Sequence, residues 1–261
     1  MPSLLSLVEM NAATLAVSLA VFLLAGFVKG VIGLGLPTVA IGLLSLVMSP
    51  VQAAALLILP SMVTNGWQLA TGGALLMLAK RLWTLLAGVV IGTLAGAGFM
   101  RADGGRHAIV VLGVALMLYA LAGLAAWTPT VPSRHERWWS PLIGLLTGLV
   151  TAATGVFVIP VVPYLQALGL PRDQLIQALG LSFTVSTLAL AVNLGQGGAF
   201  SAGVGWASLM VLLPALLGMA IGSRVRARVR AATFRRCFFI GLLLLGLHLA
   251  WHLLDLLEAT R

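Results

Sequence analysis

The chain has 261 residues, of which 61% are hydrophobic and only 8% are charged. Soluble domains carry about 25% charged residues, so this composition predicts an integral membrane protein and excludes a soluble domain. The net charge of +9 therefore does not indicate nucleic-acid binding, and the lone Cys237 excludes an intrachain disulfide and offers no metal-ligand cluster.

The first predicted elements are two apolar runs, residues 12–28 and 31–48, separated by a glycine-rich break within Gly26–Pro37. Four glycines and a proline in twelve residues make a continuous straight helix unfavourable. A helix break at membrane depth is tolerated only where its backbone is buried in protein or lines a cavity. The break therefore marks a place where a cavity is expected.

Lys29 lies within this break and is the only ionised residue between Glu9 and Lys80. One interpretation is that its side chain snorkels to a membrane surface. The other follows from the cost of an intramembrane charge, which makes such a residue a functional site by default. In that case Lys29 and the exposed amides of Gly30, Gly33 and Gly35 would hold an anion.

The remaining spans of the first half are expected at residues 51–70, 82–100 and 108–126. The longest polar connection, residues 128–140, follows them and is interpreted as a linker. It would divide the chain into a first transmembrane repeat, residues 1–127, and a second, residues 141–261. Within the span 51–70, Asn65 and Gln68 share one helical face and are candidate ligands of a substrate.

The second half restarts the pattern, because Gly144 and Gly148 are spaced as Gly26 and Gly30 are. A broken stretch, residues 141–168, contains Thr151, Thr154 and Gly155, and the spans 173–195, 204–222 and 235–255 follow. Ser182 falls where Ser61 falls in the first half. Sequence repeats in a membrane chain indicate a transporter with its site at the repeat interface.

The orientation of the halves depends on the broken stretches. The basic segment Arg224–Arg236 marks the cytoplasmic face. If residues 12–48 and 141–168 are both re-entrant pairs, three further spans follow each, so the repeats are inverted. If residues 141–168 cross once, the repeats are parallel. The distribution of positive loops favours inversion, and the predicted fold is an all-α polytopic membrane protein.

None of the six acidic residues lies deep in a predicted span, which disfavours a cation pathway lined by carboxylates. Half-helix ends at the two breaks would meet near the midplane and favour an anion. The residues predicted to contact it are Lys29, Gly30, Gly33, Gly35, Asn65, Gln68, Thr151, Thr154, Gly155 and Ser182. No arrangement of nucleophile, base and acid is recognisable, so neither an enzyme nor a cofactor is expected.

Three alternatives stay open. The first is a carrier of small carboxylates. The second is a carrier of metal cations that uses His248, His252 and Asp255, which share one face of the last span. The third is a membrane scaffold that transports nothing.

The broken segments, each followed by a short proline turn at Pro50 and Pro171, resemble the sulfite exporter TauE/SafE family of membrane permeases. The resemblance covers nearly the whole chain, including the duplication. It implies a multi-pass protein of the bacterial inner membrane that exports small anions such as sulfite or sulfonates, with the lipid bilayer and the small anion as its partners. Coupling to protons or sodium and assembly into a homo-oligomer stay open.

Overall fold

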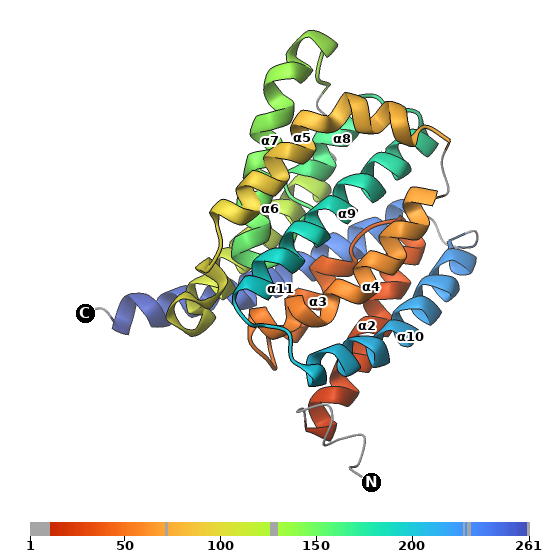
Figure 1. Ribbon diagram of the computed structural model, residues 1–261. Coiled ribbons are helices and arrows are strands. Elements are labelled where there is room, and N and C mark those ends of the chain that lie inside the picture. Colours follow the sequence, from red (N-terminus) through yellow and green to blue (C-terminus); the bar gives the residue numbers. More distant parts are fainter. Residues whose placement is uncertain (1–10, 71–72, 126–129, 227, 229–230, 260–261) are drawn as a thin grey trace.

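The computed structural model describes residues 11–70, 73–125, 130–226, 228 and 231–259. Within them the chain is helical and has no strand (Figure 1). The first helices are α2 (Ala12–Ile32), α3 (Leu36–Leu44), α4 (Pro50–Ala70), α5 (Leu75–Ala95), the 3-10 helix η1 (Phe99–Gly105) and α6 (Arg106–Leu124). The others are α7 (Ser133–Thr154), α8 (Val161–Ala167), α9 (Arg172–Gln196), α10 (Ala202–Val225) and α11 (Ala231–Ala259).

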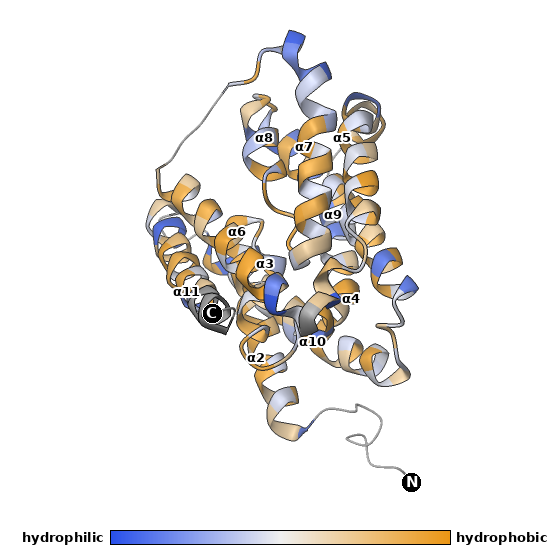
Figure 2. Cartoon of the chain, turned by 90° about the vertical axis from the view of Figure 1, so that its left-hand side faces the viewer, coloured by the Kyte–Doolittle hydropathy of each residue, from blue (hydrophilic) through white to orange (hydrophobic). Residues whose placement is uncertain are grey.

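Seven helices of the described chain are long and apolar enough to cross a membrane: α2, α4, α5, α6, α9, α10 and α11. Figure 2 shows hydrophobic residues along most of the helices, with hydrophilic residues gathered mainly near helix ends. Because a lipid core offers the backbone no hydrogen-bond partner, helices are the expected way to cross it. The predicted all-α polytopic membrane protein is confirmed at this level.

The first helix break differs from the prediction. Helix α2 does not end at residue 28 but continues through Lys29 and Gly30 to Ile32. The chain turns only at Gly33 and Gly35, whose φ angles of 81° and 106° suit glycine. The helix continues because α10 packs directly on it: a Cβ at Gly30 would lie 2.3 Å from a carbonyl oxygen of α10. Close backbone packing overrides the low helix propensity of glycine here.

Two helix pairs join the first half of the chain to the second. Helix α2 packs against α10, and α5 packs against α7. In each pair glycines spaced by four residues face each other: Gly26 and Gly30 against Gly218 and Gly222, and Gly144 and Gly148 against Gly88 and Gly92. Such glycines let helix backbones approach closely in membranes. All eight glycines lie within close contact of the facing helix backbone.

Helices α5 and α7 both begin earlier in the chain than predicted. Helix α5 begins at Leu75 instead of residue 82, and α7 begins at Ser133, inside the segment interpreted as a linker. The side chains of Arg81 and Glu136 form an ion pair between the two helices, with an N···O distance of 2.8 Å. A prediction from hydropathy begins each span after its charged residues. The ion pair between Arg81 and Glu136 allows both helices to extend beyond their apolar segments.

Candidate functional site

Lys29 lies in the last turn of α2, and its side chain is turned into the helix bundle, with only 3% of the residue exposed. Its ammonium nitrogen Nζ donates hydrogen bonds to Thr64 Oγ1 at 2.9 Å and to Asn65 Oδ1 at 2.5 Å, both on α4. Among the described residues, no Asp or Glu forms an ion pair with it. An ammonium group has three donors, so one remains for a further acceptor. The side chain of Lys29 is thus buried in protein, whereas the snorkelling interpretation required it to extend to the outside of the bundle.

The orientation of Thr64 follows from a proline in α4. Pro60 has no N–H, so Leu56 O lacks its helical partner. Ser208 Oγ on α10 donates to that oxygen at 2.9 Å and ties α10 to α4. Thr64 Oγ1 donates to Pro60 O at 2.7 Å, which directs its lone pairs away from the helix. Thr64 can therefore act as an acceptor for Lys29 while its own proton is held.

Asn65 connects three helices. Its Oδ1 accepts from Lys29 on α2, and its Nδ2 donates to Thr187 Oγ1 on α9 at 3.4 Å. Thr187 Oγ1 donates in turn to Phe183 O at 2.7 Å, so the hydroxyl presents its lone pairs to Asn65. A buried polar network is stable only where each member has a partner. The chain of neutral partners therefore holds the ammonium group without supplying a countercharge.

Gln68 joins α4 to the break after α2. Its Nε2 donates to Gly33 O at 2.7 Å, a carbonyl that the turn releases from the helix. The same glycine closes α2, because its N–H donates to Lys29 O at 2.7 Å. Both side chains predicted on one face of α4, Asn65 and Gln68, thus contact α2.

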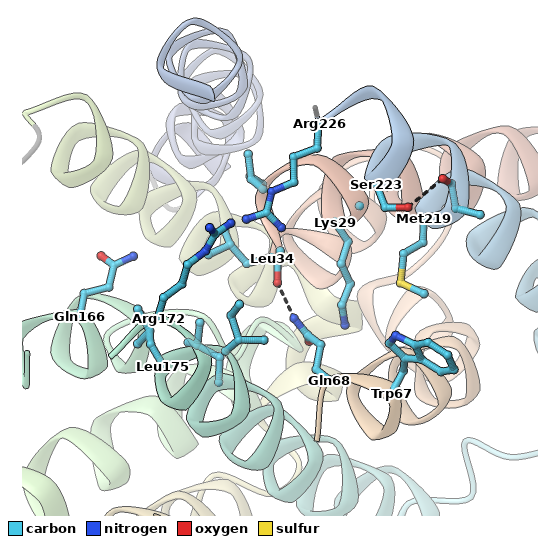
Figure 3. A pocket seen from close by; sticks show the side chains of 16 residues that line it. Lys29, Leu34, Trp67, Gln68, Gln166, Arg172, Leu175, Met219, Ser223 and Arg226 are labelled. Atoms are coloured by element: carbon cyan, nitrogen blue, oxygen red, sulfur yellow. Dashed lines mark hydrogen bonds between the residues drawn. The ribbon is translucent and has the colours of Figure 1, made fainter. Parts of the chain in front are cut away.

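These residues border a cavity of about 530 Å³ between α2, α4, α9 and α10 (Figure 3). The volume falls within the range of about 300–1,000 Å³ of small-molecule sites. Of the residues that the structure describes, no Asp or Glu lines it, and the cationic side chains that do are Lys29, Arg172 and Arg226. The other lining residues are Gly30, Ile32, Gly33, Leu34, Trp67, Gln68, Gln166, Leu175, Ile176, Leu179, Met219, Ala220 and Ser223. An apolar wall with convergent positive groups suits an anion that carries a small apolar body.

The structure brings half of the predicted site residues together. Lys29, Gly30, Gly33 and Gln68 line the cavity, and Asn65 bonds to Lys29. Gly35, by contrast, is the N-cap of α3, and no Cβ would fit there without contacting Val28 and Phe238. Its role is the turn between α2 and α3 rather than a wall of the cavity.

The second break lies elsewhere. Gly155 ends α7 with φ of 74°, as Gly33 ends α2, but a Cβ on it would lie 2.6 Å from Ile41 of α3 and 3.2 Å from Ala54 near the start of α4. Gln68, beside the first break, is 14 residues further along α4, or about 21 Å at a rise of about 1.5 Å per residue. The second break therefore packs against the middle of α3 and the start of α4, and Gly155 does not line the cavity beside Lys29, where the prediction had placed both breaks. Helix α7 continues seven residues from Gly148 to its break, whereas α2 continues only three from Gly30.

The three hydroxyl residues predicted for the site in the second half, Thr151, Thr154 and Ser182, are buried but lie outside the cavity that contains Lys29. Thr151 Oγ1 donates to Thr147 O, and Thr154 Oγ1 donates to Val150 O, each at 2.7 Å within α7. Ser182 is fully buried on α9, and its hydroxyl has no hydrogen-bond partner among the described residues. None of these three lines the cavity beside Lys29.

The prediction missed the threonines of the Lys29 network, Thr64 and Thr187, and the cationic residues of the cavity mouth, Arg172 and Arg226. The two threonines resemble the many hydroxyl residues that bond between membrane helices. The two arginines lie at helix ends, where basic residues are explained by membrane topology alone. Only the convergence of α9 and α10 on α2 identifies them as cavity residues.

The described residues hold no group of three or more metal-ligating side chains. His248 is exposed on α11, while the side chains of His252 and Asp255 lie outside the described residues. The predicted metal-cation alternative therefore has no support from the part of the chain that the structure describes.

Comparison with known proteins found no match among curated proteins and none among solved structures. The family model described as Sulfite exporter TauE/SafE matches residues 18–249, a range that includes Lys29 and every helix that borders the cavity. Members of that family are transporters and not enzymes. The match extends over nearly the whole chain, and the chain therefore belongs to the sulfite exporter TauE/SafE family of membrane transporters.

Proposed function

We propose that the protein exports small sulfur-containing anions, sulfite or organic sulfonates, across the bacterial inner membrane, with Lys29 as the central binding residue. The observation that carries the proposal is a buried ammonium group held only by the neutral acceptors of Thr64 and Asn65, on the wall of a cavity without carboxylates. A buried charge is costly unless it is paired. An anionic substrate would supply the pairing that the described protein residues do not.

The cavity favours substrates with a negative group and an apolar portion. Lys29 provides a compact positive charge, and the Gly30 and Gly33 backbone lies beside it without side chains. Leucine, isoleucine, methionine and tryptophan side chains form most of the remaining wall, beside the polar side chains of Gln68, Gln166 and Ser223. A water molecule occupies about 30 Å³ in the liquid, so a cavity of about 530 Å³ has room for an organic sulfonate as well as sulfite.

Inverted repeats and alternating access would explain the helix arrangement. Helix α2 of the first half packs on α10 of the second, and α7 of the second packs on α5 of the first, each through facing glycines. Rigid pairs of this kind can rock against each other around a fixed site. The end of α2 at Gly33 and the end of α7 at Gly155, both in a left-handed conformation, support equivalent elements in the two halves.

The conformation fits an inward-facing state. The mouth of the cavity carries Arg226, which belongs to the basic segment that marks the cytoplasmic face. At the opposite end of α9, Asn193 Nδ2 donates to Thr93 O and Arg101 Nη2 donates to Leu194 O, each at 2.9 Å. These bonds tie α9 to α5 and to η1 and would have to break for the outer side to open.

The experiment is anion flux into proteoliposomes with wild type and with Lys29→Ala. Radiolabelled sulfite and an alkyl sulfonate serve as substrates, and acetate tests the alternative that the protein carries small carboxylates. We expect wild type to move the sulfur anions and Lys29→Ala to lose that flux while it expresses normally. Lys29→Arg should also be impaired, because a planar guanidinium does not reproduce a compact ammonium between Thr64 and Asn65. Normal flux with Lys29→Ala would remove Lys29 from the mechanism.

A further inference from the structure

The mouth of the Lys29 cavity carries two further cations from separate helices. Arg172 is the first residue of α9, and Arg226 follows the last residue of α10. Figure 3 shows their guanidinium groups turned toward each other across the mouth. Both residues are exposed, and in the described part of the chain no Asp or Glu lines the cavity between them. Like charges at close range repel each other, so their convergence favours an anion between them.

This pair of arginines is separate from the Lys29 position. In Figure 3 the side chain of Gln68 lies beside the end of Lys29, and its hydrogen bond runs toward the two guanidinium groups. The hydrogen bond from Gln68 Nε2 to Gly33 O, at 2.7 Å, holds that side chain across the cavity. The cavity therefore has an inner part, which contains Lys29, and an outer part, which contains Arg172 and Arg226.

We propose that Arg172 and Arg226 form a second oxyanion site at the cytoplasmic mouth, where the substrate docks before it passes Gln68 to reach Lys29. The proposal rests on the anion-transport function proposed above. Guanidinium groups bind oxyanions with two parallel hydrogen bonds and are more weakly hydrated than an ammonium, which suits capture from water. The amino end of the 25-residue helix α9, where Arg172 lies, adds a partial positive charge.

The site gives each side chain a distinct task. The arginines raise the local concentration of oxyanions at the mouth, and their effect weakens with salt because they are exposed. Gln68 must release Gly33 O for the anion to move inward. Lys29, which is buried, then binds the anion away from solvent. Loss of an arginine is expected to raise the KM on the cytoplasmic side with little change in kcat.

The test uses inside-out membrane vesicles, which present the cytoplasmic face to the medium, and radiolabelled sulfite. Arg172→Gln and Arg226→Gln should each raise the KM about tenfold or more, the effect expected for a lost charge-assisted hydrogen bond. The matched control is Arg224→Gln, because Arg224 is exposed at the same end of α10 but does not line the cavity. An unchanged KM in both cavity variants, or an equal increase in the control, would overturn the second site.

A binding measurement on purified protein tests the mouth site separately from the transport function. Sulfate binding to purified protein should persist in Lys29→Ala and disappear in the double variant of Arg172→Gln and Arg226→Gln. If wild type transports no anion, the transport function fails, while loss of sulfate binding in the double variant still supports the mouth site. If anionic phosphatidylglycerol, but not free sulfate, competes for these arginines, they hold a lipid headgroup and the proposal is wrong.

Discussion

Replacing Gly148 with alanine tests the close packing of α5 on α7, which joins the two halves of the chain. The added Cβ would lie 2.3 Å from Val89 O and 2.6 Å from Thr93 N. Both contacts are with backbone atoms, which cannot rotate away as a side chain can. Ordinary contact begins near 3.4 Å, so the helices would have to separate by about 1 Å.

The expected cost is that of overpacking, about 1–3 kcal/mol in the free energy of unfolding. Each 1 kcal/mol lowers Tm by about 2–4 °C for a chain of about 150–250 residues, so the loss should be about 2–12 °C. The assay is the apparent Tm of detergent-purified protein, followed by size-exclusion chromatography after heating. Gly241→Ala is the matched control, since a Cβ at Gly241 on α11 meets nothing within 4 Å. A Gly148→Ala protein as stable as wild type would refute the packing argument.

Further changes test the site and its supports. Asn65→Asp places a carboxylate beside Lys29 in place of the amide; the ion pair should neutralise the site and raise the KM for sulfite at least tenfold without lowering Tm, as flux and melting assays can check. Ser208→Ala removes the donor to the buried Leu56 O and should cost about 1–3 kcal/mol, read as a lower Tm. Arg81→Met breaks a partly exposed ion pair with Glu136 and should change stability by less than about 1 kcal/mol; a larger fall in Tm would show that the pair is effectively buried.

The class of the protein and most of its spans could be predicted from hydropathy, because long apolar runs have few alternatives to a membrane helix. The end of α2 could not. Gly26 and Gly30 weaken a helix in isolation, but the backbone of α10 lies directly on them and holds the helix in place. Helix propensity is a local property, and the contact that overrides it comes from nearly 200 residues further along the chain.

The inner part of the site could be predicted because its polar residues stand out in apolar surroundings. Lys29, Asn65 and Gln68 are conspicuous for this reason, and the bonds of Asn65 and Gln68 link α4 to Lys29 of α2 and to the turn that follows α2. Arg172 and Arg226 could not be found in the same way, because each follows the ordinary rule for basic residues at span ends. The position of Gly155 in the fold could not be predicted from the sequence pattern either, because it depends on the extra turn that α7 makes after Gly148.

The most direct test of the central claim is ligand-induced stabilisation of the purified protein. A ligand at about 100 times its Kd stabilises the native state by about 2.7 kcal/mol, which a melting curve resolves. With sulfite or a small sulfonate, the Tm of wild type should rise, and that of Lys29→Ala should show no more than the smaller rise that the mouth arginines provide. An equal rise of Tm in both proteins would contradict the assignment of Lys29 as the central anion-binding residue.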